Sequence, residues 1–288
     1  MFSKREWTIL IGLVVVVLVV YAGLLLVVTR GGIKFGPVPS QPTPPWKVLT
    51  AREAYPLAEG AARAAQRIGR GAEQYALTVK RQEIPMHEPR GKQGLALMYA
   101  TAPGGADHMR APHDPAYEGF HPAGGHALEP LGLCEPLPRL ELSPRKVRAY
   151  YYTQHWWNLT NSLGICHLAS VPIDVIAPTL ALNLARALTG WDTSLWELFK
   201  VAERGSALAR VFNCREGFTP KDDLLPKRLH EAFTTGPLKD VRIDPDTFQR
   251  ALRLYYQMEG WDPDTGWPTF AKLAELGIEW AARPGDTW

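Results

Sequence analysis

The sequence predicts an all-α protein in which one transmembrane helix precedes a single helical domain. Three observations predict it: an uncharged apolar run near the N-terminus, a following stretch rich in proline, and apolar residues at helical spacing in the later segments. No segment shows the apolar–polar alternation of a half-buried strand. We therefore expect a membrane anchor over residues 1–30, a tether over 31–49 and a helical domain over 50–288.

The apolar run covers residues 7–28 and contains no charged side chain. About 20 apolar residues in a helix span the roughly 30 Å hydrocarbon core of a bilayer. A cleavable signal peptide is the alternative, but its apolar region is shorter, roughly 7–15 residues, and ends at a small-residue cleavage site. This run ends in Thr29 and Arg30, which favours a retained anchor. Basic residues lie on both sides of it, so the orientation stays open.

The stretch from 31 to 46 contains five prolines and is typical of an extended tether. Helical order is expected to begin with Thr50 and Glu53, which form a capping-box pattern, and the first helix to end at Gly69. Three later helices have start and stop signals of their own. They are expected over 178–188 before Gly190, after a cap at Asp192, and from Asp244-Pro245 to Gly260.

Composition excludes some classes of protein. The net charge is only +3 and the basic residues are scattered, which argues against a nucleic-acid-binding protein. The three cysteines, Cys134, Cys166 and Cys214, are odd in number and far apart, so they predict no disulfide framework. No two of them form a CxxC pair, so the chain is not expected to build a cysteine metal site alone.

Two short segments carry candidate chemistry. Gly164 and Ile165 precede Cys166, and a glycine there allows the backbone to approach a bulky ligand. A cysteine in that setting binds a soft metal or an iron–sulfur cluster, although a buried cysteine behind a turn is the plainer interpretation. His108 follows two glycines and Asp107, so it is a candidate for proton transfer or an ordinary loop histidine.

Two further patterns have ordinary explanations. His113, His121 and His126 suggest a zinc site, but their spacing fits no standard one. Trp156 and Trp157 could form a stacking platform, but core packing explains them as well.

Taken together and in order, eight segments resemble the C-terminal helical part of the aldehyde ferredoxin oxidoreductase family, the tungsten or molybdenum pterin enzymes. The resemblance extends from about residue 51 to about residue 277. The segments are 83–91 (EIPMHEPRG), 99–101 (YAT), 105–110 (GADHMR), 162–166 (SLGIC), 188–192 (LTGWD), 210–218 (RVFNCREGF), 222–228 (DDLLPKR) and 255–262 (YYQMEGWD).

The resemblance implies roles for individual residues. Cys166 falls on the last of four cysteine ligands to a [4Fe–4S] cluster, and Asn161, Gly164 and Ile165 fall on the loop that contacts the tungsto- or molybdopterin. His108 falls on the histidine that assists proton transfer as an aldehyde is oxidised to a carboxylic acid. In that family the electrons leave through the cluster to ferredoxin.

The departures from the family also matter. Asn161 stands where the family has an acidic residue, Gly104 where it usually has an arginine, and Glu88 where it has an aspartate. The β-rich pterin domain and a segment with three clustered cysteines have no counterpart in the sequence. One thiolate does not hold a four-iron cluster, which needs about four ligands.

The resulting expectation is a membrane-anchored partial subunit of an aldehyde ferredoxin oxidoreductase-like enzyme, inactive as an isolated chain. A protein partner would carry the pterin domain and three cluster cysteines, and ferredoxin or a similar protein would accept electrons. The alternatives are a non-catalytic membrane-tethered binding or assembly module, and a fused product without stable function. By analogy with the oxygen-sensitive clusters of the family, the soluble domain is expected to face the cytoplasm.

Overall fold

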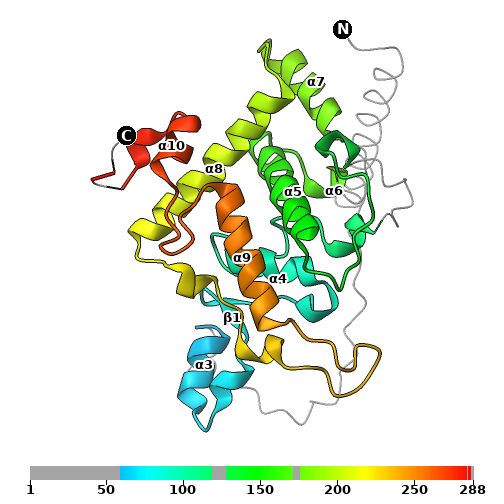
Figure 1. Ribbon diagram of the computed structural model, residues 1–288, viewed down its shortest axis with the longest axis vertical. Helices are drawn as coiled ribbons and strands as arrows, with labels where there is room; N and C mark the ends of the chain where they lie inside the picture. Colours follow the sequence, from blue (N-terminus) through cyan, green and yellow to red (C-terminus); the bar gives the residue numbers. More distant parts are fainter. Residues whose placement is uncertain (1–58, 119–127, 171–175, 284, 287–288) are drawn as a thin grey trace, which may run out of the picture. The chain divides into compact units, whose positions relative to one another are not determined.

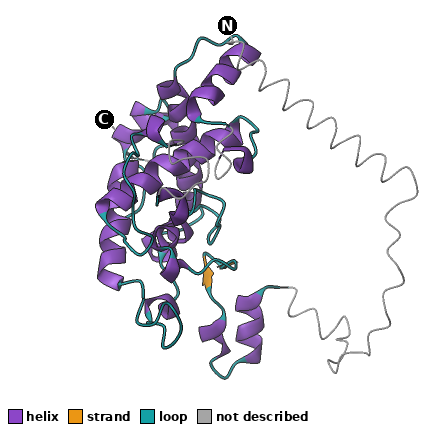
Figure 2. Cartoon of the chain, turned by 90° about the vertical axis from the view of Figure 1, so that its right-hand side faces the viewer, coloured by secondary structure: helices purple, strands orange, loops and turns teal. Residues whose placement is uncertain are grey.

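Helices form most of the structure, a computed structural model that describes residues 59–118, 128–170, 176–283 and 285–286 (Figures 1 and 2). All of these residues belong to one unit that extends from Pro56 to Trp288. The α-helices are α3 (Ala61–Ile68), α4 (Gln93–Thr101), α5 (Pro144–Ser162), α6 (His167–Ser170), α7 (Pro178–Thr189), α8 (Leu195–Arg215), α9 (Pro245–Glu259) and α10 (Phe270–Glu275). Short 3₁₀ helices are η1 (Ala72–Tyr75), η2 (Pro89–Gly91), η3 (Asp114–Tyr117), η4 (Glu129–Leu131), η5 (Pro220–Asp223), η6 (Lys227–His230) and η7 (Glu279–Ala281).

One short hairpin corrects the all-α expectation to a mostly helical fold. The strands β1 (Thr78–Val79) and β2 (Gln82–Glu83) pair antiparallel, with Val79 opposite Gln82. Lys80 and Arg81 form the two-residue turn, with φ of 48° and 67°. Positive φ at both central residues is the geometry of the tight turns that match the twist of paired strands. The hairpin is too short to give the alternating pattern by which strands are recognised in a sequence.

Helix α5 packs against α4, α8 and α9. It begins where the sequence provides an N-cap, because Ser143 Oγ accepts a hydrogen bond from Lys146 N at 3.4 Å and Pro144 occupies the first turn. Eleven of its 19 residues are buried, and they lie on all sides of the helix. The two adjacent tryptophans, Trp156 and Trp157, are 1% and 4% exposed, so they are core residues and not an open stacking platform.

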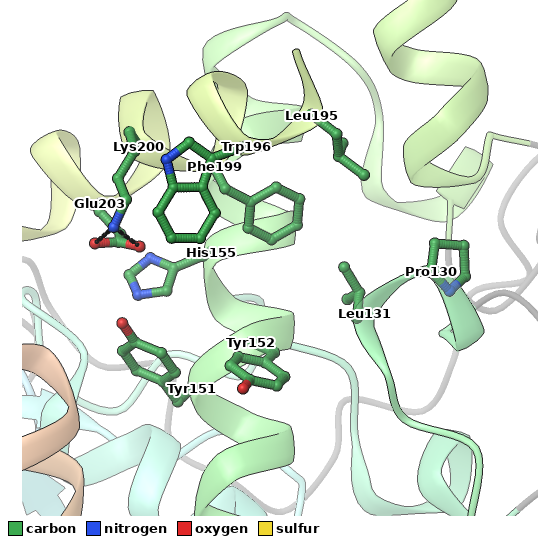
Figure 3. Close-up of a pocket in the computed structure, with 10 residues that line it drawn as sticks. All are labelled: Pro130, Leu131, Tyr151, Tyr152, His155, Leu195, Trp196, Phe199, Lys200 and Glu203. Atoms are coloured by element: carbon green, nitrogen blue, oxygen red, sulfur yellow. Dashed lines mark hydrogen bonds and ion pairs between the residues drawn. The ribbon is translucent and has the colours of Figure 1, made fainter.

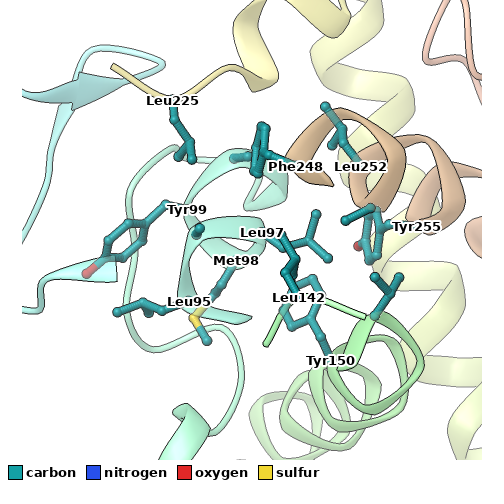
Figure 4. Packing of buried hydrophobic residues seen from close by; sticks show 14 of the residues in the cluster. Leu95, Leu97, Met98, Tyr99, Leu142, Tyr150, Leu225, Phe248, Leu252 and Tyr255 are labelled. Carbon is teal, nitrogen blue, oxygen red and sulfur yellow. The ribbon is translucent and has the colours of Figure 1, made fainter. Parts of the chain in front are cut away.

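Helix α4 is buried along almost its whole length. Leu95, Leu97, Met98 and Tyr99 are at most 1% exposed and belong to a hydrophobic cluster with residues of α5 and α9 (Figure 4). A helix that is apolar all round must be covered on every side. Helix α4 is therefore a core helix.

Most of the predicted helix ends are confirmed. Gly69, Gly190 and Gly260 follow α3, α7 and α9 with positive φ of 62°, 69° and 67°. Gly190 and Gly260 have the left-handed conformation typical of glycine after a helix. Asp244 Oδ1 accepts from Thr247 N at 2.9 Å and caps α9 as expected. Helix α8 differs, because Ser194 and not Asp192 caps it. The predicted capping box at Thr50 lies outside the described residues.

Within the described ranges, no helix combines the length and the apolar character needed to cross a membrane. The two longest, α5 and α8, each carry several charged residues, which makes insertion costly. The predicted anchor and tether lie outside the described residues. This finding contradicts the predicted localisation, a single-pass membrane protein with a cytoplasmic domain.

Candidate functional site

Three imidazole rings meet beside the start of α4. The ring centroids of His87 and His108 lie 4.7 Å apart, those of His87 and His113 4.6 Å, and those of His108 and His113 5.7 Å. All three rings are partly exposed. His108, the histidine predicted to transfer protons, is therefore one of three neighbouring rings, which we call the imidazole cluster.

Lys92 organises two of the three rings. Its Nζ lies 3.2 Å from Nδ1 of His87 and 3.4 Å from Nδ1 of His113. An ammonium group only donates, so both Nδ1 atoms accept and both rings carry their proton on Nε2. His113 Nε2 then donates to the carbonyl oxygen of His108 at 2.9 Å. The His108 ring makes no hydrogen bond to any of the described residues.

The environment keeps two members of the cluster neutral. Burial, with smaller contributions from Lys92 and the other two imidazoles, lowers the pKa of His113 to about 4, against the opposing effect of its hydrogen bond to His108. Burial also lowers the pKa of His87, again with a contribution from Lys92. At neutral pH His108 therefore lies beside two uncharged rings, an arrangement suited to a residue that exchanges protons with a substrate.

A buried ion pair holds the His113 end of this cluster. Asp114, directly after His113, accepts from Gly94 N at 3.0 Å and from Leu95 N at 3.1 Å, so it caps α4 from a distant segment. Lys146 Nζ of α5 lies 2.5 Å from Asp114 Oδ1. Both side chains are at most 1% exposed. A Cβ atom at Gly94 would lie 2.9 Å from Asp114 Oδ1, so the close approach requires glycine.

The hairpin holds the other side of the His108 loop. Gly105 has φ of 102°, and a Cβ atom there would lie 2.2 Å from the carbonyl oxygen of Val79 in β1. Only glycine permits this contact. Gly105, which precedes His108 in the sequence, is therefore explained by packing against the hairpin.

The predicted cofactor loop begins at the C-terminus of α5. Ile165 N donates to Thr160 O at 2.8 Å and Gly164 N donates to Asn161 O at 3.1 Å, which is a Schellman motif. Gly164 has φ of 68°, as the motif requires, and no described atom lies within 4 Å of where its Cβ would be. The glycine is explained by helix termination, and the space beside it is open.

The four predicted cofactor residues differ in exposure. Asn161, Gly164 and the thiol-bearing Cys166 are exposed, while Ile165 packs against a second hydrophobic cluster that includes Trp157. Met109, the neighbour of His108, packs against the same cluster. The pKa of His167, lowered mainly by burial, also responds to the charges of the His108 loop. The two predicted loops thus share one core cluster.

The described residues do not by themselves fit a four-iron cluster. They contain no group of three or more histidines, cysteines or acidic residues placed to hold a metal ion. Cys134 is exposed, and Cys214 is buried with its Sγ 3.6 Å from Gly266 O. His113 lies in the imidazole cluster, while His121 and His126 of the suggested zinc site lie outside the described residues.

The segment at 88–90, which lies within one of the matched segments, has a structural role. Glu88 accepts from Arg90 Nε at 3.0 Å and from Nη2 at 2.8 Å, and Arg90 also donates to Glu231 O at 2.9 Å. The Arg90 guanidinium lies 3.7 Å from the centre of the Phe233 ring. This buried arginine ties η2 to the segment after η6, next to His87.

His87, Lys92 and His113 were not assigned to the site by sequence analysis. His87 lies within segment 83–91, and Lys92 follows that segment directly. Their proximity depends on how α4 and η3 pack, so the spacing of 26 residues between His87 and His113 gave no signal. The only signal in the sequence was that His87 lies within a segment that matches the family and that Lys92 follows it.

A mostly helical unit thus carries both the imidazole cluster and the exposed thiol of Cys166. The family model for aldehyde ferredoxin oxidoreductase, domains 2 and 3, matches residues 52–278. The chain therefore belongs to the aldehyde ferredoxin oxidoreductase family, as the resemblance indicated.

Curated relatives agree with this assignment. The tungsten-containing aldehyde ferredoxin oxidoreductase of Pyrococcus abyssi is 33% identical over 229 residues, which are 77% of this chain and 34% of the relative. The enzyme of the same name from Pyrococcus furiosus is 31% identical over 226 residues, with the same coverage. The chain thus spans about a third of the length of these relatives.

A solved structure shares the fold. The BamBC active-site complex of benzoyl coenzyme A reductase, in complex with 1,5-dienoyl-CoA, superposes with a TM-score of 0.54 over 78% of this chain and 36% of that one. The sequence identity is 22%. The match supports the arrangement of the helices.

Proposed function

We propose that the chain is the helical part of an aldehyde ferredoxin oxidoreductase-like enzyme that a protein partner completes. The observation that carries this is the exposed thiol of Cys166 at the ordered end of α5, on the loop that matches the family. Leu163 and Leu168 on either side are 37% and 56% exposed. These two exposed leucines would be covered if a partner protein bound beside Cys166.

The partner would supply the pterin domain and the remaining ligands. A four-iron cluster needs about four thiolates, and Cys166 would be one of them. Asn161, Gly164 and Ile165 would contact the tungsto- or molybdopterin, since the space beside Gly164 is open. The structurally similar benzoyl coenzyme A reductase is described as an active-site complex, which supports a partner.

The reaction of the completed enzyme would convert an aldehyde and water into a carboxylic acid, two protons and two electrons. Ferredoxin or a similar protein would receive the electrons. His108 would exchange one of the protons through its imidazole, which is partly exposed and has no competing hydrogen bond among the described residues. The neutral rings of His87 and His113 beside it would avoid repelling the charged form of His108.

Metal analysis of the full chain, isolated without oxygen together with the proteins bound to it, tests this function. We expect about four irons and one tungsten or molybdenum per complex, and a partner that contains clustered cysteines. Cys166→Ser should lose the iron. Cys134→Ser is the matched control, because Cys134 is also exposed, and it should retain the iron. Equal iron in the two variants would contradict the role of Cys166.

The competing function is a non-catalytic binding or assembly module. The amide of Asn161, where the family has an acidic residue, favours it. A stable complex that contains neither iron nor tungsten nor molybdenum, with a partner that lacks clustered cysteines, would overturn the oxidoreductase and support the module.

A further inference from the structure

A cavity of about 450 Å³ lies between α5, α8 and η4 (Figure 3). Its volume is within the range of sites that bind small molecules, roughly 300–1,000 Å³. None of its lining residues is among those that the family resemblance assigns. The walls are mostly aromatic and aliphatic, formed by Tyr151, Tyr152, Phe199, Trp196, Leu131 and Leu195.

One polar side chain in this cavity has unmet hydrogen-bonding capacity. His155 is 1% exposed, and neither ring nitrogen has a hydrogen-bond partner among the described residues. Its Nε2 lies 3.4 Å from Glu259 Oε1, without hydrogen-bond geometry. The Tyr151 ring packs edge-on against it at 4.8 Å. Leaving a buried polar atom unpaired is unfavourable, so such atoms call for an explanation.

The charges at the cavity are already neutralised. Lys200 Nζ lies 3.0 Å from Glu203 Oε2 and 2.7 Å from Glu275 Oε1, and Lys272 Nζ lies 3.1 Å from the carboxylates of both glutamates. Two lysines therefore balance two glutamates. The two charged side chains that line the cavity, Lys200 and Glu203, are thus paired, which favours a neutral ligand.

The aromatic walls favour a flat ring system. Trp196 is 71% exposed at the cavity, and Lys200 Nζ lies 4.5 Å from the centre of its ring. Figure 3 shows the His155 ring between Tyr151 and the Lys200–Glu203 pair. An aromatic ligand would gain ring contacts with the walls, and a hydroxyl group could pair with either tautomer of His155 because it both donates and accepts.

We infer that this cavity binds a small neutral aromatic molecule that carries a hydroxyl group, held by His155 and by the rings of Tyr151, Phe199 and Trp196. This site is independent of the oxidoreductase function proposed above. The hydroxyl satisfies the imidazole, and the rings supply the apolar contact.

Fluorescence titration of the full chain with 2-naphthol tests the inference. We expect saturable binding with a dissociation constant of about 1 mM or below. Decahydro-2-naphthol keeps the hydroxyl without the aromatic rings and should bind more weakly. Absence of saturable 2-naphthol binding would overturn the inference.

Two variants locate the site. Trp196→Ala should weaken binding about fivefold, while Trp280→Ala, at a tryptophan that is also 71% exposed but does not line the cavity, should not. His155→Phe should weaken binding about tenfold, and the unliganded variant should unfold at the same or a higher temperature because the unpaired nitrogens are gone. Wild-type affinity in His155→Phe, or equal loss in both tryptophan variants, would refute the assignment.

Discussion

Lys80 Nζ lies 2.5 Å from Asp223 Oδ1, and both side chains are at most 1% exposed. Arg210 Nη1 contacts the other carboxylate oxygen at 2.7 Å, and Tyr256 OH donates to it as well. The lysine comes from the hairpin turn, the arginine from α8 and the aspartate from η5. One carboxylate therefore joins the hairpin to the core through two cations.

Replacement of Asp223 by Asn should lower the free energy of unfolding by about 3–5 kcal/mol, because two buried cations would lose their counter-ion. Chemical denaturation measures the change. Asp264→Asn is the control, since the pair of Asp264 with Arg253 is exposed, and it should cost at most about 1 kcal/mol. Similar losses in the two variants would contradict the structural role of Asp223.

Stability should decrease as the pH falls from about 6.5 to about 4. The pKa of His113 in the folded protein is about 4, below the ordinary 6.5, so the unfolded chain binds the proton more readily in this window. The contribution is fully present above pH 6.5 and is lost as the pH falls through the folded pKa. Burial also lowers the pKa of His87, so protonation of His87 at low pH should destabilise the folded protein as well.

His113→Gln should reduce the slope of unfolding free energy against pH. The reduction should correspond to less than one proton, because His113 is partly exposed and solvent screens some of the effect. Denaturation at a series of pH values measures the slope. An unchanged slope would show that His113 does not carry the effect.

Two glycine substitutions should change stability in opposite directions. Gly164→Ala should cost about 1 kcal/mol, because φ of 68° disfavours a side chain even where space is open. Gly205→Ala, inside α8 and also without a described atom nearby, should add about 0.5–1 kcal/mol. Thermal unfolding compares the two variants, and a stabilising Gly164→Ala would exclude the Schellman assignment.

Local signals predicted the outer helices well. The cap at Asp244 and the stop at Gly260 define α9, because both act within one turn. The two buried helices, α4 and α5, were missed for the same physical reason. Their buried residues lie on all sides, so no apolar stripe appears at helical spacing.

The site was predicted only in part. The resemblance placed His108 and Cys166 on two separate loops. In the described structure their neighbours Met109 and Ile165 pack against the same hydrophobic cluster. Sequence separation hid the grouping of His87 with His113, because packing of α4 creates it. Gly164 was predicted to make room for a ligand, but the Schellman motif that ends α5 also requires a glycine at this position.

The carboxylate of Asp114 has two structural roles. It accepts hydrogen bonds from the N-terminal backbone of α4, and it neutralises Lys146. Gly94 leaves the room in which both occur. We therefore expect the three positions to depend on one another: a larger residue at 94, or a neutral one at 146, should destabilise the fold unless position 114 changes with it. His113 directly precedes Asp114. Substitutions at positions 94, 114 or 146 would therefore shift the His113 ring relative to His87 and His108 without any substitution among the histidines.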